Sequence, residues 1–325
     1  MTAQRGIVCA GNWIVDIIHD ISHWPEESDL VNISGQTIGV GGGAANVAFN
    51  LAALQVDYPV LPAGLLGHDN HGELVRSACH EVGLPVEQLS SIPKVCTAHT
   101  HVMNVQHNSR TFFYNAGANA HFDEHTLSMK AIAKHNPSIF YLGYLNLLPL
   151  LDASDGQGRT GAAKLLAQAR AVGMITCVDL VSSLSDTYAK TVMGTLLNID
   201  WLFLNEVEAS RATGVILNGE EDRTNMSRAA SKLMSGGLGQ GCVLHTPKLT
   251  LWKTVDDEIW YEVPQIPKYD IISPVGAGDA FAAGILHGLH ENWSAQDCIY
   301  LGNKMAAACL RAPTATGGIL TLKEL

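Results

Sequence analysis

Apolar runs of strand length alternate with segments of helical pattern along this chain, and no other feature restricts its possible folds as strongly. The expected strands are residues 7–10, 60–66, 139–144, 174–180, 201–204 and 242–245. Such continuous apolar runs are typical of strands covered on both faces in a parallel sheet. Helical patterns occupy residues 73–82, 123–135, 162–172, 225–234 and 295–310. The alternation predicts an α/β fold with a doubly wound, mostly parallel sheet and ligands across the carboxyl ends of its strands.

Size, composition and charge narrow the class of protein. A chain of 325 residues with 47% hydrophobic and 16% charged residues is globular and can bury a large core. The net charge of −11 argues against a nucleic-acid partner, because a phosphate backbone requires a basic surface. The longest apolar run, residues 139–151, is interrupted by Gly143, Asn146 and Pro149 and is too short to span a membrane. Residues 1–5 show no signal-peptide pattern, so we expect a cytoplasmic protein.

The cysteines and histidines give only weak signals. The seven cysteines are an odd number without C-x-x-C spacing, which favours reduced thiols over a disulfide framework. Two histidine pairs, His99 with His101 and His19 with His23, have spacings that would bring the rings to one face of a strand or helix. Without nearby Cys or carboxylate partners, packed or surface histidines are a more common interpretation than a metal site.

Two polar, turn-rich segments with β-like alternation interrupt the main pattern. They lie within residues 19–38 and 95–122 and pair naturally as a small, separate sheet. We therefore expect one α/β domain over residues 1–325, with a β subdomain from residues 12–38 and 95–122 inserted in it.

The stretch Ser273–Phe281 carries the strongest chemical signal. The small residues Gly276, Ala277 and Gly278 precede a helical pattern, so they stand at a helix N-terminus. The free N–H groups and positive dipole end of a helix there can hold an anion such as a phosphoryl group. Asp279 follows in the first turn and can act as a base toward a hydroxyl within hydrogen-bond reach. The alternative is a tight turn in which Asp279 only caps the helix.

Two further glycines, Gly284 and Gly288, are four residues apart on the same predicted helix. Glycine lowers helix propensity, so its presence at this spacing needs a packing reason. We expect these glycines to form a face that packs closely against the sheet.

A second glycine turn, Gly39–Asn46, leads into a helix over residues 47–54. It matches the dinucleotide pattern G-x-G-x-x-A, which would suggest a nicotinamide dehydrogenase. However, no clean strand precedes it, and no acidic residue ends a second strand about 20 residues later. The alternative is a turn that lets the backbone approach a small polar ligand, with Asn46 offering both a donor and an acceptor.

Asp16 lies inside the apolar run 13–18, just after the strand that ends at Asn12. An ionised carboxylate among large apolar side chains needs a partner, which is either the hydroxyls of a ligand or a backbone turn. Trp13 either stacks on a ligand or packs beneath the sheet. No Lys or Arg occurs between Arg5 and Arg76, which predicts an uncharged substrate if this half of the chain binds it.

In this order, the two glycine stretches and the pair Asn205-x-x-Glu208 make the chain resemble the ribokinase (PfkB-type) family of carbohydrate and nucleoside kinases. The resemblance extends from Gly11 to Gly318, and its most specific motifs are Gly41-Gly42-x-x-x-Asn46 and Gly276-Ala277-Gly278-Asp279. It implies a doubly wound α/β core with a small β-sheet lid, residues 12–38 and 95–122. In this family the lid often forms a dimer interface, so the resemblance also implies a homodimer.

The resemblance implies a role for each residue that matches a family motif. Asp279 would be the catalytic base, with Gly276, Ala277 and Gly278 as the anion hole. The substrate contacts would be Asn12, Asp16, Gly42 and Asn46. The nucleotide side would use Asn205, Glu208, Thr246 and Asn303, and Glu208 would organise Mg²⁺ through water. The implied reaction is transfer of the γ-phosphoryl group of ATP to a hydroxyl of a neutral sugar or nucleoside, and it requires no P-loop, which the chain lacks.

The chain departs from the family pattern in two places. Ser273-Pro274 replaces the usual Asp-Thr before the anion hole, which leaves activation by a monovalent cation undecided. Residues 246–250, Thr-Pro-Lys-Leu-Thr, replace Thr-x-Gly-x-x-Gly, so two glycines near the nucleotide phosphates are missing. Lys248 either compensates by its charge or lies at the surface. The alternative function is a catalytically weak, sugar-binding or regulatory homologue with an altered nucleotide site.

Overall fold

The computed structural model of the chain describes residues 4–105 and 110–324. Within these residues the larger sheet has nine strands in the order β13-β12-β11-β10-β9-β8-β1-β4-β5. Their bounds are β1 (Ile7–Gly11), β4 (Val60–Gly67), β5 (Gln88–Ile92), β8 (Ile139–Leu145), β9 (Ile175–Leu180), β10 (Trp201–Asn205), β11 (Gly241–His245), β12 (Leu249–Thr254) and β13 (Glu258–Glu262). Neighbouring strands pair in parallel except at β12, which is antiparallel to both β11 and β13. The predicted α/β class with a mostly parallel sheet is confirmed.

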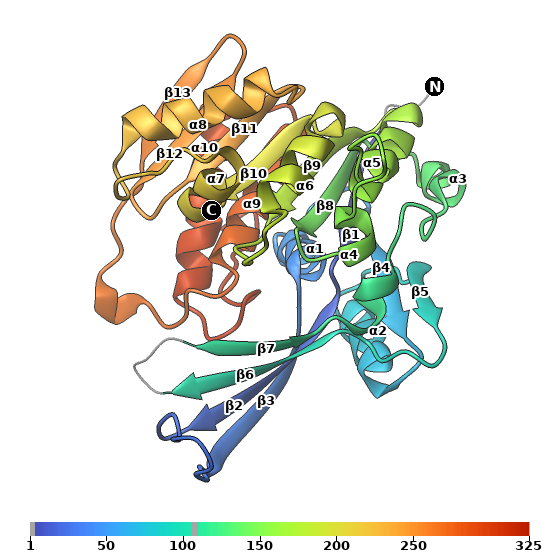
Figure 1. Cartoon of the computed structure of the whole chain (residues 1–325), viewed down its shortest axis with the longest axis vertical. Helices are drawn as coiled ribbons and strands as arrows, with labels where there is room; N and C mark the ends of the chain where they lie inside the picture. The colour runs from blue at the N-terminus through green and yellow to red at the C-terminus, as the bar shows by residue number, and fades with distance from the viewer. Residues whose placement is uncertain (1–3, 106–109, 325) are drawn as a thin grey trace.

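Helices cover both faces of the large sheet (Figure 1). One face carries α1 (Gly43–Ala53), α2 (Asn70–Glu81), α9 (Ala277–His290) and α10 (Ala295–Leu310). The opposite face carries α3 (Met129–Ile132), α4 (Pro149–Asp152), α5 (Gly161–Ala171), α6 (Tyr188–Thr195), α7 (Glu206–Thr213) and α8 (Arg223–Ser235). Each group encloses its own apolar core, because successive side chains of a strand point to opposite faces and these strands are apolar throughout.

Side-chain caps fix where several helices begin, whereas α1 and α9 begin at glycines. The caps of α2, α5, α7, α8 and α10 accept backbone N–H groups and are Asp69, Thr160, Asn205, Asp222 and Ser294. Helices α1 and α9 instead begin at Gly42 and Gly276, which have no side chain to offer. Because the first N–H groups of a helix lack intrahelical acceptors, these two starts remain open to a ligand.

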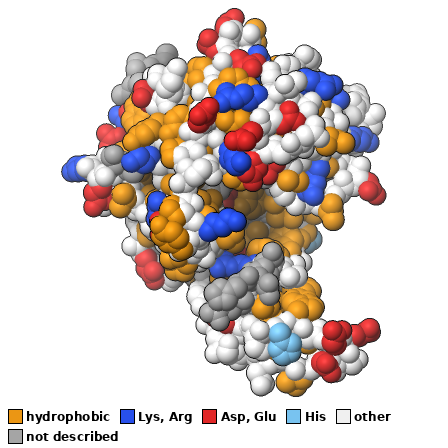
Figure 2. Space-filling model, turned by 90° about the vertical axis from the view of Figure 1, so that its left-hand side faces the viewer, with side chains coloured by type: hydrophobic (Ala, Val, Ile, Leu, Met, Phe, Trp, Pro, Cys, Tyr) orange, Lys and Arg blue, Asp and Glu red, His pale blue; other side chains and the backbone are white. Residues whose placement is uncertain are grey.

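The second sheet has the order β3-β2-β6-β7. Its strands are β2 (Ile14–Ile21), β3 (Ile33–Gly41), β6 (His99–Val105) and β7 (Thr111–Asn115). Figure 1 shows this sheet, hereafter the lid, projecting from the carboxyl-terminal side of the large sheet. Between the lid and the main body, the surface in Figure 2 is hollowed, with hydrophobic side chains inside and Lys or Arg side chains at its edge. None of the helices in the described part of the chain has the length and apolar character that a membrane span requires.

The helix expected over residues 123–135 is wrong in extent. Asp123 begins a turn in which its carboxylate accepts hydrogen bonds from the His125 N–H and the Thr126 hydroxyl (3.0 and 2.8 Å). Helical structure starts only at Met129 and consists of α3 followed by a 3₁₀ turn, Ala133–His135. The local side-chain bonds of Asp and Thr compete with the helix there, which hydrophobic spacing alone does not reveal.

The close-packed face expected of Gly284 and Gly288 exists, but it contacts a helix instead of the sheet. A Cβ on Gly284 would collide with the backbone of Gly302, and one on Gly288 would collide with Cys298. Both neighbours lie on α10. The small residues therefore let the last two long helices approach each other, which the spacing on one helix could not distinguish from packing on the sheet.

Candidate active site

The N-terminus of α9 is open toward the hollow beneath the lid. Gly276 has a left-handed φ of 86°, and a Cβ there would collide with Ala315. A Cβ on Gly278 would meet no atom within 4 Å. Among the described residues, the N–H groups of Gly278 and Asp279 have no acceptor, and that of Ala277 makes only a long bond of 3.5 Å to Pro274. This helix start therefore offers free donors and free space to an anion.

Asp279 is the carboxylate at this helix start, and it is only 3% exposed. Its Oδ2 accepts two hydrogen bonds of 2.8 Å, from Asn46 Nδ2 on α1 and from the Tyr144 hydroxyl at the end of β8. Its Oδ1 has no partner among the described residues. The hypothesis that Asp279 only caps α9 is wrong, because its bonds run to other elements. Oδ2 is held by these two bonds, and Oδ1 has no protein partner in the described part of the chain.

The surroundings of Asp279 bring its pKa close to neutral pH. The pKa of Asp279 is raised to about 7, above all by burial. The hydrogen bonds from Asn46 and Tyr144 lower this pKa, and the negative charges of Glu208 and Asp16 raise it. A carboxylate with a pKa close to the working pH is well suited to accept a proton, since it is both available as a base and strong enough to act.

Asp16 lies on β2 in the lid, opposite Thr100 on β6. Burial raises the pKa of Asp16 to about 6, against the hydrogen bond from Thr100 and the charge of Arg110, which lower it. A Cβ on Gly41 would collide with the Asp16 carboxylate. The glycine turn thus leaves room for the carboxylate, and Asp16 and Asp279 are close enough for their charges to interact.

Asn12 follows β1 and is fully buried. Its amide donates to the carbonyls of Gly143 and Tyr144 (3.2 and 3.3 Å), and its Oδ1 accepts from Asn119 (3.2 Å). The predicted substrate contact is therefore already occupied by bonds to the protein. Asn12 joins the ends of β1 and β8 and holds the Tyr144 backbone. Gly42, the other predicted contact beside it, caps α1 with φ 94° and leaves no room for a Cβ against the Asn12 carbonyl.

Tyr144 is a site residue that the sequence analysis missed. It has a left-handed φ of 61°, at the point where the β8–β9 register shifts between Leu142 and Leu145. This irregular end of the strand turns the ring toward α1, where a Cβ on Gly43 would collide with it. In the sequence, the signal for this residue is a Tyr at the end of an apolar strand. Aromatic residues rarely adopt a left-handed backbone conformation, so nothing in the sequence indicates this geometry.

Asn205 and Glu208 lie at the start of α7 and form a capping box. The Asn205 side chain accepts from the N–H groups of Val207 and Glu208, and Glu208 Oε2 accepts from the Asn205 N–H, all at 2.9 Å. Glu208 Oε1 accepts from the Ser182 hydroxyl, also at 2.9 Å. Burial raises the pKa of Glu208, and its charge acts on Asp179 and Asp279. The pair thus has a structural role, and the charge of Glu208 also acts on Asp279.

A further missed residue is Asp179, which ends β9 and is 7% exposed. Burial raises its pKa well above the usual range, and Glu208 and Asp279 add to the effect. Its partners are the Tyr141 hydroxyl (3.3 Å) and the N–H of Leu180 (2.9 Å). The sequence indicated a polar strand end here, but not that the side chain would join the same group of carboxylates.

Thr246 and Asn303, the remaining nucleotide-side predictions, lie near β12. The Thr246 hydroxyl donates to the Glu220 carbonyl (2.7 Å) and accepts from the N–H groups of the β11–β12 turn, so its bonding capacity is used locally. The Asn303 amide bonds Thr250 (3.3 Å) and its own helix. The Lys248 ammonium lies 3.6 Å from the Glu221 carboxylate, with both side chains largely exposed, which favours the surface interpretation for Lys248.

The structure places Trp13 in the core and brings several histidines together. Trp13 is fully buried and donates to the Ala63 carbonyl (3.0 Å), so it belongs to the core and does not stack on a ligand. His19 and His101 bond each other at 3.0 Å, and His99 lies beside His101 on β6. In the part of the chain that the structure describes, no group of three or more His, Cys, Asp or Glu side chains is arranged to hold a metal ion.

This combination of a doubly wound sheet, a lid and a carboxylate at an open helix start defines a small-molecule phosphotransferase, and the sequence pattern of pfkB family carbohydrate kinases matches residues 4–322. The chain belongs to this family. The nucleoside kinase of Methanocaldococcus jannaschii is 23% identical over 307 residues, 94% of this chain and 90% of that protein. The ribokinase of Arabidopsis thaliana is 25% identical over 311 residues, 94% of this chain and 76% of that protein.

Solved structures show the same fold. The Arabidopsis thaliana ribokinase complexed with ribose and ATP superposes with a TM-score of 0.81 at 23% identity, covering 99% of this chain and 97% of that one. The Burkholderia thailandensis nucleoside kinase in complex with inosine gives a TM-score of 0.73 at 17% identity, covering 98% and 95%. The predicted ribokinase-like architecture with its smaller second sheet is thus confirmed.

Proposed function

We propose that this protein transfers the γ-phosphoryl group of ATP to a hydroxyl of a neutral sugar or nucleoside, with Asp279 as the general base. One observation carries the proposal. Asp279 Oδ1 and Asn46 Oδ1 are buried acceptors without a partner among the described residues, on two side chains that bond each other. Buried polar atoms are nearly always satisfied, so a ligand with two neighbouring O–H donors completes this site.

The proposed step begins when the acceptor hydroxyl donates to Asp279 Oδ1. The hydroxyl oxygen attacks the γ-phosphorus, and the hydroxyl proton passes to the Asp279 carboxylate. The bond from the γ-phosphorus to the bridging oxygen breaks, and ADP leaves with the electron pair of that bond. The free N–H groups of Gly278 and Asp279 stabilise the charge on the transferred phosphoryl oxygens. The products are a phosphate ester and ADP, and the protonated Asp279 releases its proton to solvent.

Asn205 and Glu208 fit Mg²⁺ only through water. Each Glu208 oxygen already accepts one bond within the protein and retains a further lone pair for a water ligand. Mg²⁺ bound with the nucleotide would neutralise phosphate charge there. The capping box fixes the position of the Glu208 carboxylate, which would hold such a water ligand.

ATP and the acceptor class are inferred from the family. The Arabidopsis ribokinase structure contains ribose and ATP, and the Burkholderia nucleoside kinase structure contains inosine. Around the acceptor site of this chain, the charge of Arg110 is offset by that of Asp16, which supports a neutral acceptor. For the nucleotide base we propose the region of Asn303 and Thr250, with the Thr246 backbone beside it.

A catalytically weak, sugar-binding homologue is the second candidate. The observation in its favour is the 246–250 segment, in which the Thr246 hydroxyl and the Lys248 ammonium are both directed to protein groups. This second candidate requires that the protein no longer binds the nucleotide phosphates productively. However, the Asp279 carboxylate and the free N–H groups at the start of α9 are intact.

We also propose a homodimer formed through the lid. Several large apolar side chains on or beside this sheet are about half exposed or more, including Trp24, Leu30, Ile33, Ile38, Phe112 and Phe113. An exposed apolar patch of this kind typically marks an interface. A second copy of the lid offers the same apolar surface in return, as a two-fold interface requires.

ADP release measured over a panel of acceptors tests the proposed function. The panel contains ribose, fructose, ketodeoxy sugar acids and nucleosides, each with MgATP. We expect turnover with at least one neutral sugar or nucleoside and none with the acids. Acceptor binding without ADP release from any compound would instead support the second candidate.

A further inference from the structure

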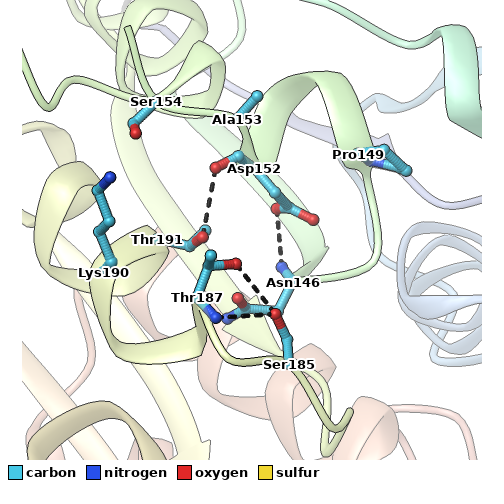
Figure 3. Close-up of a pocket in the computed structure, with 9 residues that line it drawn as sticks. All are labelled: Asn146, Pro149, Asp152, Ala153, Ser154, Ser185, Thr187, Lys190 and Thr191. Atoms are coloured by element: carbon cyan, nitrogen blue, oxygen red, sulfur yellow. Dashed lines mark hydrogen bonds between the residues drawn. The ribbon is translucent and has the colours of Figure 1, made fainter. Parts of the chain in front are cut away.

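A cavity of about 270 Å³ lies beside the phosphotransfer site, between α4, α6 and the loop that follows β8 (Figure 3). Most of the residues that line it carry polar side chains, among them Asn146, Asp152, Ser154, Ser185, Thr187 and Lys190. None of the residues assigned to the base, the anion hole, the acceptor or the nucleotide lines it. Its size suits a small metabolite.

The Asn146 side chain indicates that the cavity is built for a ligand. The residue is 9% exposed, and its Nδ2 has no hydrogen-bond partner among the described residues. In Figure 3 the side chain points toward Ser185 and Thr187, into the space between them and α4. A buried amide left unpaired costs roughly 1–3 kcal/mol, so an occupant that presents an acceptor would be stabilised here.

The charges on the walls define the occupant. Among the described residues, Lys190 has no ion-pair partner, so its ammonium is available to an anion. Both oxygens of Asp152 accept backbone N–H groups, from Asn146 and Leu148 (2.9 and 2.8 Å), and this carboxylate opposes a dianion such as phosphate. The walls thus carry one positive group, one negative group and several hydroxyls, which favours a small hydroxylated monocarboxylate. Its carboxylate would bind Lys190, and its hydroxyls would bind the other polar groups of the walls.

The cavity is connected to both halves of the phosphotransfer site. Asn146 lies two residues after Tyr144, and both have left-handed φ angles, 75° and 61°. The Asn146 carbonyl accepts from the Ser183 hydroxyl (3.1 Å), and the preceding Ser182 donates to Glu208. A ligand that binds the Asn146 amide therefore acts on the short segment that carries the Tyr144 hydroxyl to Asp279.

We propose that this cavity binds a small hydroxylated monocarboxylate, such as a sugar acid, and that the bound acid changes the rate of phosphoryl transfer through the Tyr144–Asn146 segment. The effector role rests on the proposed kinase function, whereas the binding site does not.

Isothermal titration of the full chain with gluconate, without nucleotide, tests the binding site. We expect gluconate to bind and sorbitol, its neutral counterpart, to give no heat. Lys190→Met should weaken gluconate binding about tenfold or more, and Asn146→Asp, which tolerates the left-handed backbone, should abolish it. Lys134→Met removes the same charge at the opposite end of β8 and should leave binding unchanged.

Absence of gluconate binding, equal binding of sorbitol, or unchanged binding by Lys190→Met would overturn the site. The last result would show that gluconate binds outside this cavity. In the ADP-release assay, gluconate should change the kcat of the wild type but not of Lys190→Met, whose kcat without gluconate should equal that of the wild type. Gluconate binding at the cavity without any change in kcat would overturn the effector role while leaving the kinase proposal intact.

Discussion

At the scale of single residues, the site depends on how the two oxygens of one carboxylate are used. Asn46 and Tyr144 both donate to Asp279 Oδ2, which leaves Oδ1 available to the proposed acceptor hydroxyl. The same two bonds lower a pKa that burial raises to about 7. The protein thus fixes the direction of the base and limits how strongly burial suppresses its ionisation.

Tyr144→Phe should shift the pH dependence of activity. Asp279 acts as a base only when ionised, so kcat/KM falls as the pH falls through its pKa. Removing the Tyr144 hydroxyl removes one interaction that lowers this pKa, so the acidic limb should move to higher pH. A pH–rate profile of both proteins measures the shift. An acidic limb that stays in place or moves to lower pH would contradict the assigned role, and Tyr114→Phe, which loses a hydroxyl bonded to Asn119, serves as the control.

The sequence motifs predicted Asp279 and Asn46 because glycine turns and short polar side chains leave a local pattern. They did not predict Tyr144, which reaches the site through a left-handed backbone that depends on contacts made across β1, α1 and β8. Asn12 was assigned to the substrate by position, yet its amide is used to hold the Tyr144 carbonyl. Hydrogen bonds between residues far apart in the chain leave no recognisable pattern in the sequence.

At the scale of elements, the two glycines at the start of α9 differ: the fold needs a glycine at Gly276 but would accept a side chain at Gly278. Gly276 needs a left-handed backbone and contact with Ala315, whereas Gly278 faces open space in a normal helical conformation. The first glycine shapes the turn, and the second leaves the space that the proposed phosphoryl group would occupy.

Gly276→Ala and Gly278→Ala should therefore have opposite effects. We expect Gly276→Ala to lower the free energy of unfolding by roughly 1–3 kcal/mol, because it combines backbone strain with a collision. Gly278→Ala should keep or slightly raise it, by up to about 1 kcal/mol from helix propensity, while lowering kcat. Urea unfolding and ADP release measure the two quantities. Full activity of Gly278→Ala would contradict the proposal that this helix start binds the phosphoryl group.

The order and type of the main elements follow from hydrophobic periodicity, since long apolar strands between helices have few alternative folds. The neighbours of each element were harder to predict. Gly284 and Gly288 indicated close packing correctly, but the partner is α10, which lies next to α9 only after the chain folds back.

At the scale of the whole molecule, the surface between the lid and the main body is hollowed (Figure 2). Asp16 comes from the lid, Asn46 from α1 and Asp279 from α9. Asn46 donates a hydrogen bond to Asp279, and the charge of Asp16 acts on Asp279. The same lid exposes apolar side chains that a second copy would cover.

The double substitution Phe112→Glu/Phe113→Glu should convert the proposed dimer to a monomer. The two side chains are 55% and 50% exposed and lie on opposite faces of β7, so the pair places a charge on each face of the lid. Light scattering after size exclusion gives the mass. Val255→Glu, at a 77% exposed position outside the lid, is the control. A monomeric wild type, or a double variant that stays dimeric, would contradict the lid interface.

The central claim is that Asp279 removes the proton from an acceptor hydroxyl that is held within the hollow. The most direct measurement compares Asp279→Asn with the wild type in calorimetric acceptor binding and in ADP release. The substitution keeps the shape of the side chain, so acceptor affinity should change little, while kcat should fall by roughly 10²–10⁴-fold, the usual contribution of a general base. A kcat within a few-fold of the wild type would show that another group takes the proton.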